Sequence, residues 1–227
     1  MYIFHGDNHI ASRQALVDFI EESRNKYVRT ISYQASELSL AQLESALGEI
    51  SLFNDQVLTV IEEVHSLIKS THRTTLIDYL SKSQDIESIV LWEKKPLTPS
   101  QLALFNRAKL TLFKASKSLF RWLDSLSPNS SAQQKLQLFT QAVTEDGIEY
   151  CFLMLVRQIR LLLTVRDGGT IVGPPFVQRN LQNQARLFSL AQLLNIHEKL
   201  TNIDTETKTG GTRMTLKQQL DLLQIQL

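Results

Sequence analysis

Two features of this 227-residue chain have residue types that occur in nucleotide sites. One is the Gly-Asp-Asn turn at 6–8, which directly follows a short apolar run, and the other is the acidic pair of Glu62 and Glu63 at the end of a β-forming run. A phosphate-binding loop needs a glycine-rich turn ending in Gly-Lys-Ser or Gly-Lys-Thr, because backbone N–H groups and the lysine hold the phosphates. The turn has one glycine, and the first lysine of the chain is Lys26. We therefore expect no intact Walker A motif, no ATP hydrolysis and no cofactor, with the acidic pair as a solvated strand end.

The remaining side chains with catalytic or metal-binding chemistry are scattered along the sequence. His65 and His72 are close enough to share a helix face, but no acidic cluster joins them at ligand spacing. The single cysteine, Cys151, lies in an apolar run and is expected to be an inert core thiol, which leaves no disulfide and no thiolate zinc site. No Gly-x-Ser-x-Gly motif occurs. We expect no catalytic residue and no metal site, and this expectation includes the other histidines, His5, His9 and His197.

Composition is that of an ordinary soluble globular protein. Hydrophobic residues make up 43% of the chain, charged residues 21%, and the formal net charge is +1. Such a balance gives no global attraction to nucleic acid or to an anionic membrane, so any DNA contact has to come from a local patch. The sequence has neither a transmembrane-length apolar run nor the basic flank of a signal peptide. We expect a cytoplasmic protein with no membrane partner.

Strand and helix patterns alternate through the first half of the chain. Alternating or continuous apolar runs predict strands at 2–5, 28–33, 56–61, 86–92 and 112–114. Apolar residues at helical spacing predict helices at 8–25, 39–48, 64–82 and 116–126, with another helix that begins at Thr98. This alternation predicts an α/β domain with a parallel sheet and helices on both faces.

The second half lacks strand patterning. Residues 127–131, Ser-Pro-Asn-Ser-Ser, form the clearest linker signal of the chain. Helices are predicted after it at 132–144, 149–166, 174–187, 189–207 and 214–227. We therefore predict two domains, an α/β domain at 1–126 and an all-α domain at 127–227.

Arginines on two of the predicted C-terminal helices are candidate contacts to a partner. A nucleic-acid patch and ordinary surface charges whose stems cover the bundle are the two interpretations, and no interleaved aromatic residues support base stacking. The residues concerned are Arg157, Arg160, Arg179 and Arg186.

A bulky apolar pair, Leu52 and Phe53, stands directly before a polar turn and the strand predicted at 56–61. Turns are normally polar, so a Leu-Phe pair at the start of one is either buried in the core or presented to a partner. The local sequence leaves both interpretations open.

Several segments, taken in order, resemble the bacterial DNA polymerase III delta subunit, the clamp-loader arm that opens the sliding clamp. The opening at 2–8 looks like that family's degenerate, nucleotide-free version of the AAA+ first strand and loop, and 51–62 looks like its clamp-binding segment. The segment at 156–163 is similar to the family's arginine-bearing collar helix. Further similar segments are 174–177, 184–190 and 204–211, the last with an acidic residue followed by Lys-x-Gly.

The resemblance implies a non-catalytic clamp-loader subunit of the DNA polymerase III holoenzyme. In that family the Leu-Phe pair is the wedge that enters the clamp, which gives Leu52 and Phe53 the role of clamp-binding residues. The implied partners are the sliding clamp (beta subunit) and the ATPase subunits, which pair with the C-terminal helical collar. Primer-template DNA within the complex is a further candidate partner, through the collar arginines.

The chain departs from the family in one respect. Family members are usually longer and carry a small helical domain between the α/β domain and the collar, and the interval between Leu112 and Ser127 is too short for it. The delta-prime relative matches less well, because its zinc-binding cysteines and its Ser-Arg-Cys motif are absent. The alternatives to clamp loading are a structural adaptor in which Leu52 and Phe53 are buried, and a diverged nucleotide-binding P-loop-like protein.

Overall fold

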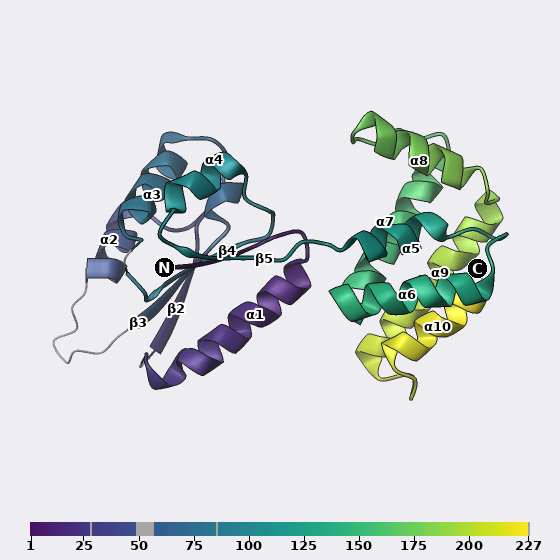
Figure 1. Ribbon diagram of the computed structural model, residues 1–227, viewed down its shortest axis with the longest axis horizontal. Coiled ribbons are helices and arrows are strands. Elements are labelled where there is room, and N and C mark those ends of the chain that lie inside the picture. The colour runs from purple at the N-terminus through teal and green to yellow at the C-terminus, as the bar shows by residue number, and fades with distance from the viewer. Residues whose placement is uncertain (28, 49–56, 85, 227) are drawn as a thin grey trace. The chain divides into compact units, whose positions relative to one another are not determined.

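The computed structural model describes residues 1–27, 29–48, 57–84 and 86–226. The chain divides into two compact units, Met1–Ala115 and Ser116–Leu227 (Figure 1).

The first unit is built on a parallel sheet. Its strands follow the order β2-β3-β4-β1-β5, so the first strand in sequence lies between the last two. All of the neighbouring pairs are parallel. The strands are β1 (Tyr2–His5), β2 (Arg29–Gln34), β3 (Val57–Glu62), β4 (Ile89–Glu93) and β5 (Lys109–Leu112).

Helices cover both faces of this sheet (Figure 1). On one face, Phe4 of β1 and Leu16 of α1 belong to the same buried cluster. On the other face, Ile3 of β1 shares a core with Leu43 and Leu76 of the helices opposite. This confirms the predicted three-layer α/β fold, because adjacent residues of a strand point to opposite faces. The helices are α1 (His9–Glu22), α2 (Leu40–Gly48), α3 (Thr71–Lys82) and α4 (Pro99–Leu102), with short 3-10 turns η1 (Ser23–Asn25), η2 (Val64–Ser66) and η3 (Ala103–Phe105).

The helix predicted over 64–82 is wrong in its first turns. Glu63 takes the left-handed conformation (φ 63°), and only the short 3-10 turn η2 follows before the chain extends at Leu67. A new helix, α3, then begins where the Ser70 side chain accepts a hydrogen bond from the Arg73 N–H. Ile68 is 87% exposed, so the apolar residues that favoured one continuous helix do not share a buried face.

The last strand also differs from its prediction. It spans Lys109–Leu112 and pairs with β1, with Tyr2 opposite Lys109, whereas the sequence favoured 112–114. Lys109–Leu112 alternates polar and apolar residues, but every residue of this edge strand is exposed, so no buried apolar face fixes its position.

The second unit is all helical, as predicted, but it begins earlier than the sequence indicated. The helix α5, predicted as the end of the first domain, packs within the second unit, where the Trp122 ring lies 4.8 Å from the Phe139 ring. The Ser-Pro-Asn-Ser-Ser segment is therefore a turn inside this unit, and the units divide after Ala115 rather than at 126/127. The helices are α5 (Lys117–Ser125), α6 (Ala132–Asp146), α7 (Ile148–Arg166), α8 (Pro175–Ala185), α9 (Leu190–Thr209) and α10 (Leu216–Gln226).

None of the helices among the described residues is long and apolar enough to cross a membrane.

Candidate functional site

The carboxyl ends of β1, β3 and β4 bring several titratable side chains to one edge of the sheet. The chain leaves β1 into α1 on one face and leaves β4 toward α4 on the other face (Figure 1). Open parallel sheets bind ligands in the crevice outside the strand ends at such a switch point. The side chains at this edge include His5, Glu62 and Glu93, and all three are buried.

The turn after β1 is closed by the chain that follows β5. The Asn8 N–H donates to the Phe113 carbonyl oxygen at 3.0 Å, and the Phe113 N–H donates to the His5 carbonyl oxygen at 2.8 Å. Gly6 has a φ of 149°, and a Cβ atom there would lie 2.0 Å from the Phe113 oxygen. The Asn8 side chain caps α1 by accepting from the Ala11 N–H at 3.0 Å. In a phosphate-binding loop, backbone N–H groups of this turn and of the helix start point toward the anion. Here the N–H groups of Asn8 and Ala11 instead donate to other atoms of the protein.

Glu62, at the end of β3, is a buried acid that forms an ion pair with the half-exposed Arg13. Both terminal nitrogens of Arg13 donate to its carboxylate, at 2.8 and 2.7 Å, and the Gln34 amide donates at 3.0 Å. The Arg13 guanidinium also lies 3.8 Å from the centre of the Trp92 ring. The hydrogen bonds from Arg13 lower the pKa of Glu62, against the opposing effect of burial. The expectation of a solvated strand end is wrong for this residue, because the pair ties α1 to the edge of the sheet.

His65 and Glu93 form a second buried pair at the same edge. The His65 backbone N–H donates to Glu93 Oε1 at 2.9 Å, and the ring Nδ1 lies 2.9 Å from the same oxygen. The ring also makes an edge contact with Phe105, with centroids 5.7 Å apart. Its Nε2 is buried and has no hydrogen-bond partner among the described residues.

His5 is the third member of this cluster. Its Nδ1 accepts a hydrogen bond from the Leu97 N–H at 3.1 Å, so this nitrogen carries no proton. Burial lowers the pKa of the His5 ring, the Glu93 carboxylate opposes that shift, and His65 adds to it. The neutral ring is therefore the form that this environment favours.

These histidines are scattered along the sequence, and their meeting at one edge of the sheet was not predicted. His65 and Glu93 are 28 positions apart, and their proximity follows from the parallel pairing of β3 with β4. Their positions in the sequence could have indicated this meeting, since His5 ends a predicted strand and His65 and Glu93 each follow one. No group of three or more His, Cys, Asp or Glu side chains among the described residues is placed to hold a metal ion.

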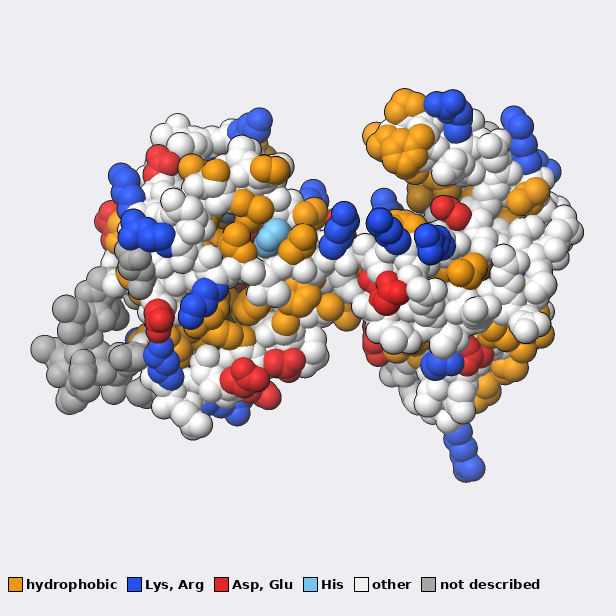
Figure 2. Space-filling view, in the orientation of Figure 1, with side chains coloured by type: hydrophobic (Ala, Val, Ile, Leu, Met, Phe, Trp, Pro, Cys, Tyr) orange, Lys and Arg blue, Asp and Glu red, His pale blue; other side chains and the backbone are white. Residues whose placement is uncertain are grey.

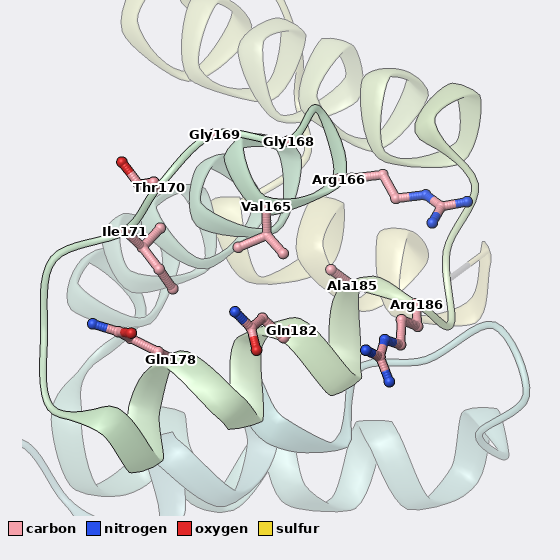
Figure 3. A pocket seen from close by; sticks show the side chains of 10 residues that line it. All are labelled: Val165, Arg166, Gly168, Gly169, Thr170, Ile171, Gln178, Gln182, Ala185 and Arg186. Atoms are coloured by element: carbon pink, nitrogen blue, oxygen red, sulfur yellow. The ribbon is translucent and has the colours of Figure 1, made fainter.

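The four candidate arginines of the second unit are exposed, and one of them, Arg186, lines a cavity. Arg186 at the end of α8 and Arg166 at the end of α7 belong to the wall of a cavity of about 520 Å³ (Figure 3). The Gln178 and Gln182 side chains of α8 line the same space. Arg166, Gln178 and Gln182 were not among the candidate residues from the sequence, and Arg157, Arg160 and Arg179 are exposed elsewhere on α7 and α8.

Basic and acidic side chains are interspersed on the face of the molecule seen in Figure 2. Several basic side chains lie close together at one side of the second unit on that face, with acidic side chains beside them.

The predicted clamp-binding residues Leu52 and Phe53 lie outside the described residues. The helix predicted before them is present as α2, with Leu43 fully buried in the core and Ala41, Gln42 and Glu44 exposed. Cys151, the single thiol, is buried, and its surroundings raise the pKa of the thiol to about 12, chiefly through burial. It is the inert core residue that the sequence predicted.

Among solved structures, one that is similar to this chain covers most of its length. It is the Bacillus subtilis DNA clamp loader delta protein, with a TM-score of 0.45 and 15% sequence identity over 99% of this chain and 94% of that chain. No family model and no curated protein sequence matches the chain.

Proposed function

We propose that this protein is a non-catalytic clamp-loader subunit of the delta type, which binds and opens the sliding clamp during DNA replication. The observation that carries the proposal is the closed turn after β1. A parallel sheet of this kind offers a nucleotide site at that turn, and here Phe113 and the Asn8 cap take the hydrogen bonds that phosphates need. A sheet unit whose first turn has no phosphate site, followed by a helical unit, is what the resemblance to the delta family implies.

The proposed mechanism is mechanical. Leu52 and Phe53 enter an apolar pocket of the ring-shaped clamp and favour opening of the ring interface. Burying two such side chains contributes roughly 3–6 kcal/mol in total. Association itself opposes binding by an amount of similar size or larger, so the wedge alone does not hold the clamp tightly. The exposed side of α2 would supply the additional contacts, since this helix directly precedes the wedge in the chain.

The helical unit is the proposed collar that joins the ATPase subunits of the loader. Exposed apolar side chains on three of its helices support a protein contact: Phe176 of α8 is 63% exposed, Leu194 of α9 is 53% exposed and Ile225 of α10 is 56% exposed. The ATPase partners would supply the nucleotide-driven step. Primer-template DNA is a further proposed contact, at the cavity that Arg166 and Arg186 share.

Binding to a purified bacterial sliding clamp tests this proposal. The parent protein is compared with the Leu52→Ala/Phe53→Ala variant, and both are checked for folding by circular dichroism. A matched control is Leu112→Ala/Phe120→Ala, because these side chains are 53% and 48% exposed and lie outside the proposed wedge. If the wedge pair were core, as in an adaptor, the first variant would lose several kcal/mol of stability.

A further inference from the structure

A second cavity, of about 390 Å³, lies in the first unit next to the buried His65–Glu93 pair. Its wall is built by η2, α3, α4 and η3, and includes His65 itself. The charged side chains of the wall are Lys69, Arg73 and Asp78, so cationic groups outnumber acidic ones. Ile77 and Leu104 give part of the wall an apolar character.

His65 is the unusual member of this wall. Its side chain is 3% exposed, and Glu93 occupies its Nδ1. The Nε2 atom has no hydrogen-bond partner among the described residues. Buried polar atoms in native proteins nearly always have a partner, so an unpaired one is a position where a water, ion or ligand can bind.

The neighbouring cations indicate what kind of ligand fits. Arg73 donates one hydrogen bond to the Leu67 carbonyl at 3.3 Å, which holds its guanidinium at the turn before α3 and leaves further N–H groups for a ligand. A guanidinium and an ammonium beside an imidazole are the groups that recognise a tetrahedral oxyanion. Glu93 engages the His65 Nδ1, so Nε2 is the ring nitrogen that remains for a ligand.

We propose that this cavity binds the phosphate group of a small phosphorylated ligand. In the bound form, His65 Nε2, Arg73 and Lys69 bind the phosphate group, and Ile77 and Leu104 contact the rest of the ligand. The cavity volume exceeds that of a phosphate ion and lies in the range typical of small-ligand pockets. This site is independent of the clamp-loader proposal, since it uses neither the wedge nor the helical unit.

The test is a nuclear magnetic resonance titration of the full chain with ¹⁵N-labelled histidine rings. Inorganic phosphate and ribose 5-phosphate are the probes, and tighter binding of the sugar phosphate would identify a phosphomonoester rather than the free ion as the ligand. The expected result is a saturable shift of the His65 Nε2 resonance. Arg73→Gln is expected to weaken that binding by roughly tenfold or more, the effect of one lost charge-assisted hydrogen bond.

Two variants make the result decisive. His65→Asn removes Nε2 while its amide nitrogen replaces Nδ1 as a donor to Glu93, so it identifies the resonance without leaving the carboxylate unpaired. Lys94→Gln removes an exposed cation outside the cavity and is expected to bind like the parent. A His65 Nε2 resonance that does not respond to millimolar concentrations of either probe overturns the proposal. So does an equal response in Arg73→Gln.

Discussion

Arg13 of α1 and Glu62 of β3 form a bidentate ion pair, with nitrogen–oxygen distances of 2.8 and 2.7 Å. The acid of this pair is nearly buried, and the arginine lies over the Trp92 ring. A charged group at the end of a central strand is thereby held by the protein rather than offered to a ligand.

Arg13→Ala is expected to lower the free energy of unfolding by about 1–2 kcal/mol. Charge-assisted hydrogen bonds contribute roughly 1.5–3 kcal/mol, and the value is reduced because the Arg13 side chain is 43% exposed. Urea denaturation measures the change. The control is Arg24→Ala, whose contact with Glu21 spans 3.9 Å between well-exposed side chains and should contribute almost nothing. Equal stability of the two variants would contradict the structural role of the pair.

Gly6→Ala is expected to destabilise the protein by about 3 kcal/mol or more. A Cβ atom would overlap the Phe113 carbonyl, and the backbone conformation strongly disfavours any other residue. Gly210→Ala is the matched comparison, because Gly210 also has a positive φ (68°) but no atom lies within 4 Å of its added Cβ. That change should cost only about 1 kcal/mol. Thermal denaturation that ranks the two substitutions the other way would show that the turn is not closed by Phe113.

The stability of the first unit is expected to fall as the pH is lowered below about 6.5. The folded pKa of His5 is depressed, so the unfolded chain binds a proton first, and the stabilisation present above the unfolded pKa is lost as the pH falls toward the folded pKa. Protonation at Nδ1 would also remove the acceptor for the Leu97 N–H. Glu62 also stabilises the folded state, but over a lower pH range. Its folded pKa is depressed as well, so its stabilisation is lost only as the pH falls below about 4.5.

Urea denaturation between about pH 7 and pH 5, with parent and His5→Asn, measures the His5 contribution. The variant is expected to show a shallower loss of stability over this range. Identical pH profiles would assign the effect to other groups.

ATP is expected not to bind saturably at micromolar concentrations, because the backbone of the turn after β1 is occupied and Glu62 is paired with Arg13. Isothermal titration calorimetry with Mg·ATP measures this. Saturable micromolar binding would favour the rival interpretation, a diverged nucleotide-binding protein.

Much of the fold follows from local patterns in the sequence. The buried strand at β3 and the capped helix at α9 both carry strong local signals, an apolar run in one case and a Ser189 cap in the other. The domain boundary does not follow from such signals. The Trp122 indole N–H donates to Gln224 across 102 positions, and this contact inside the second unit has no local signature.

Some features of the candidate sites also follow from local sequence, and others depend on how distant segments pack. The absence of a Walker A loop at 6–8 could be inferred, because its residues are missing there, but the closure of this turn by Phe113 could not. The pairing of His65 with Glu93 depends on which strands are neighbours, and a single sequence does not specify the order of strands in a sheet. The shared cavity of Arg166 and Arg186 depends equally on how α7 packs against α8.

Surface-immobilised binding to a sliding clamp tests the central claim most directly. The clamp-loader proposal predicts that the parent protein and Leu112→Ala/Phe120→Ala bind the clamp, and that a folded Leu52→Ala/Phe53→Ala variant loses binding. Undiminished binding by that folded variant would contradict the wedge assignment. Failure of the parent protein to bind any bacterial clamp would contradict the clamp-loader function itself.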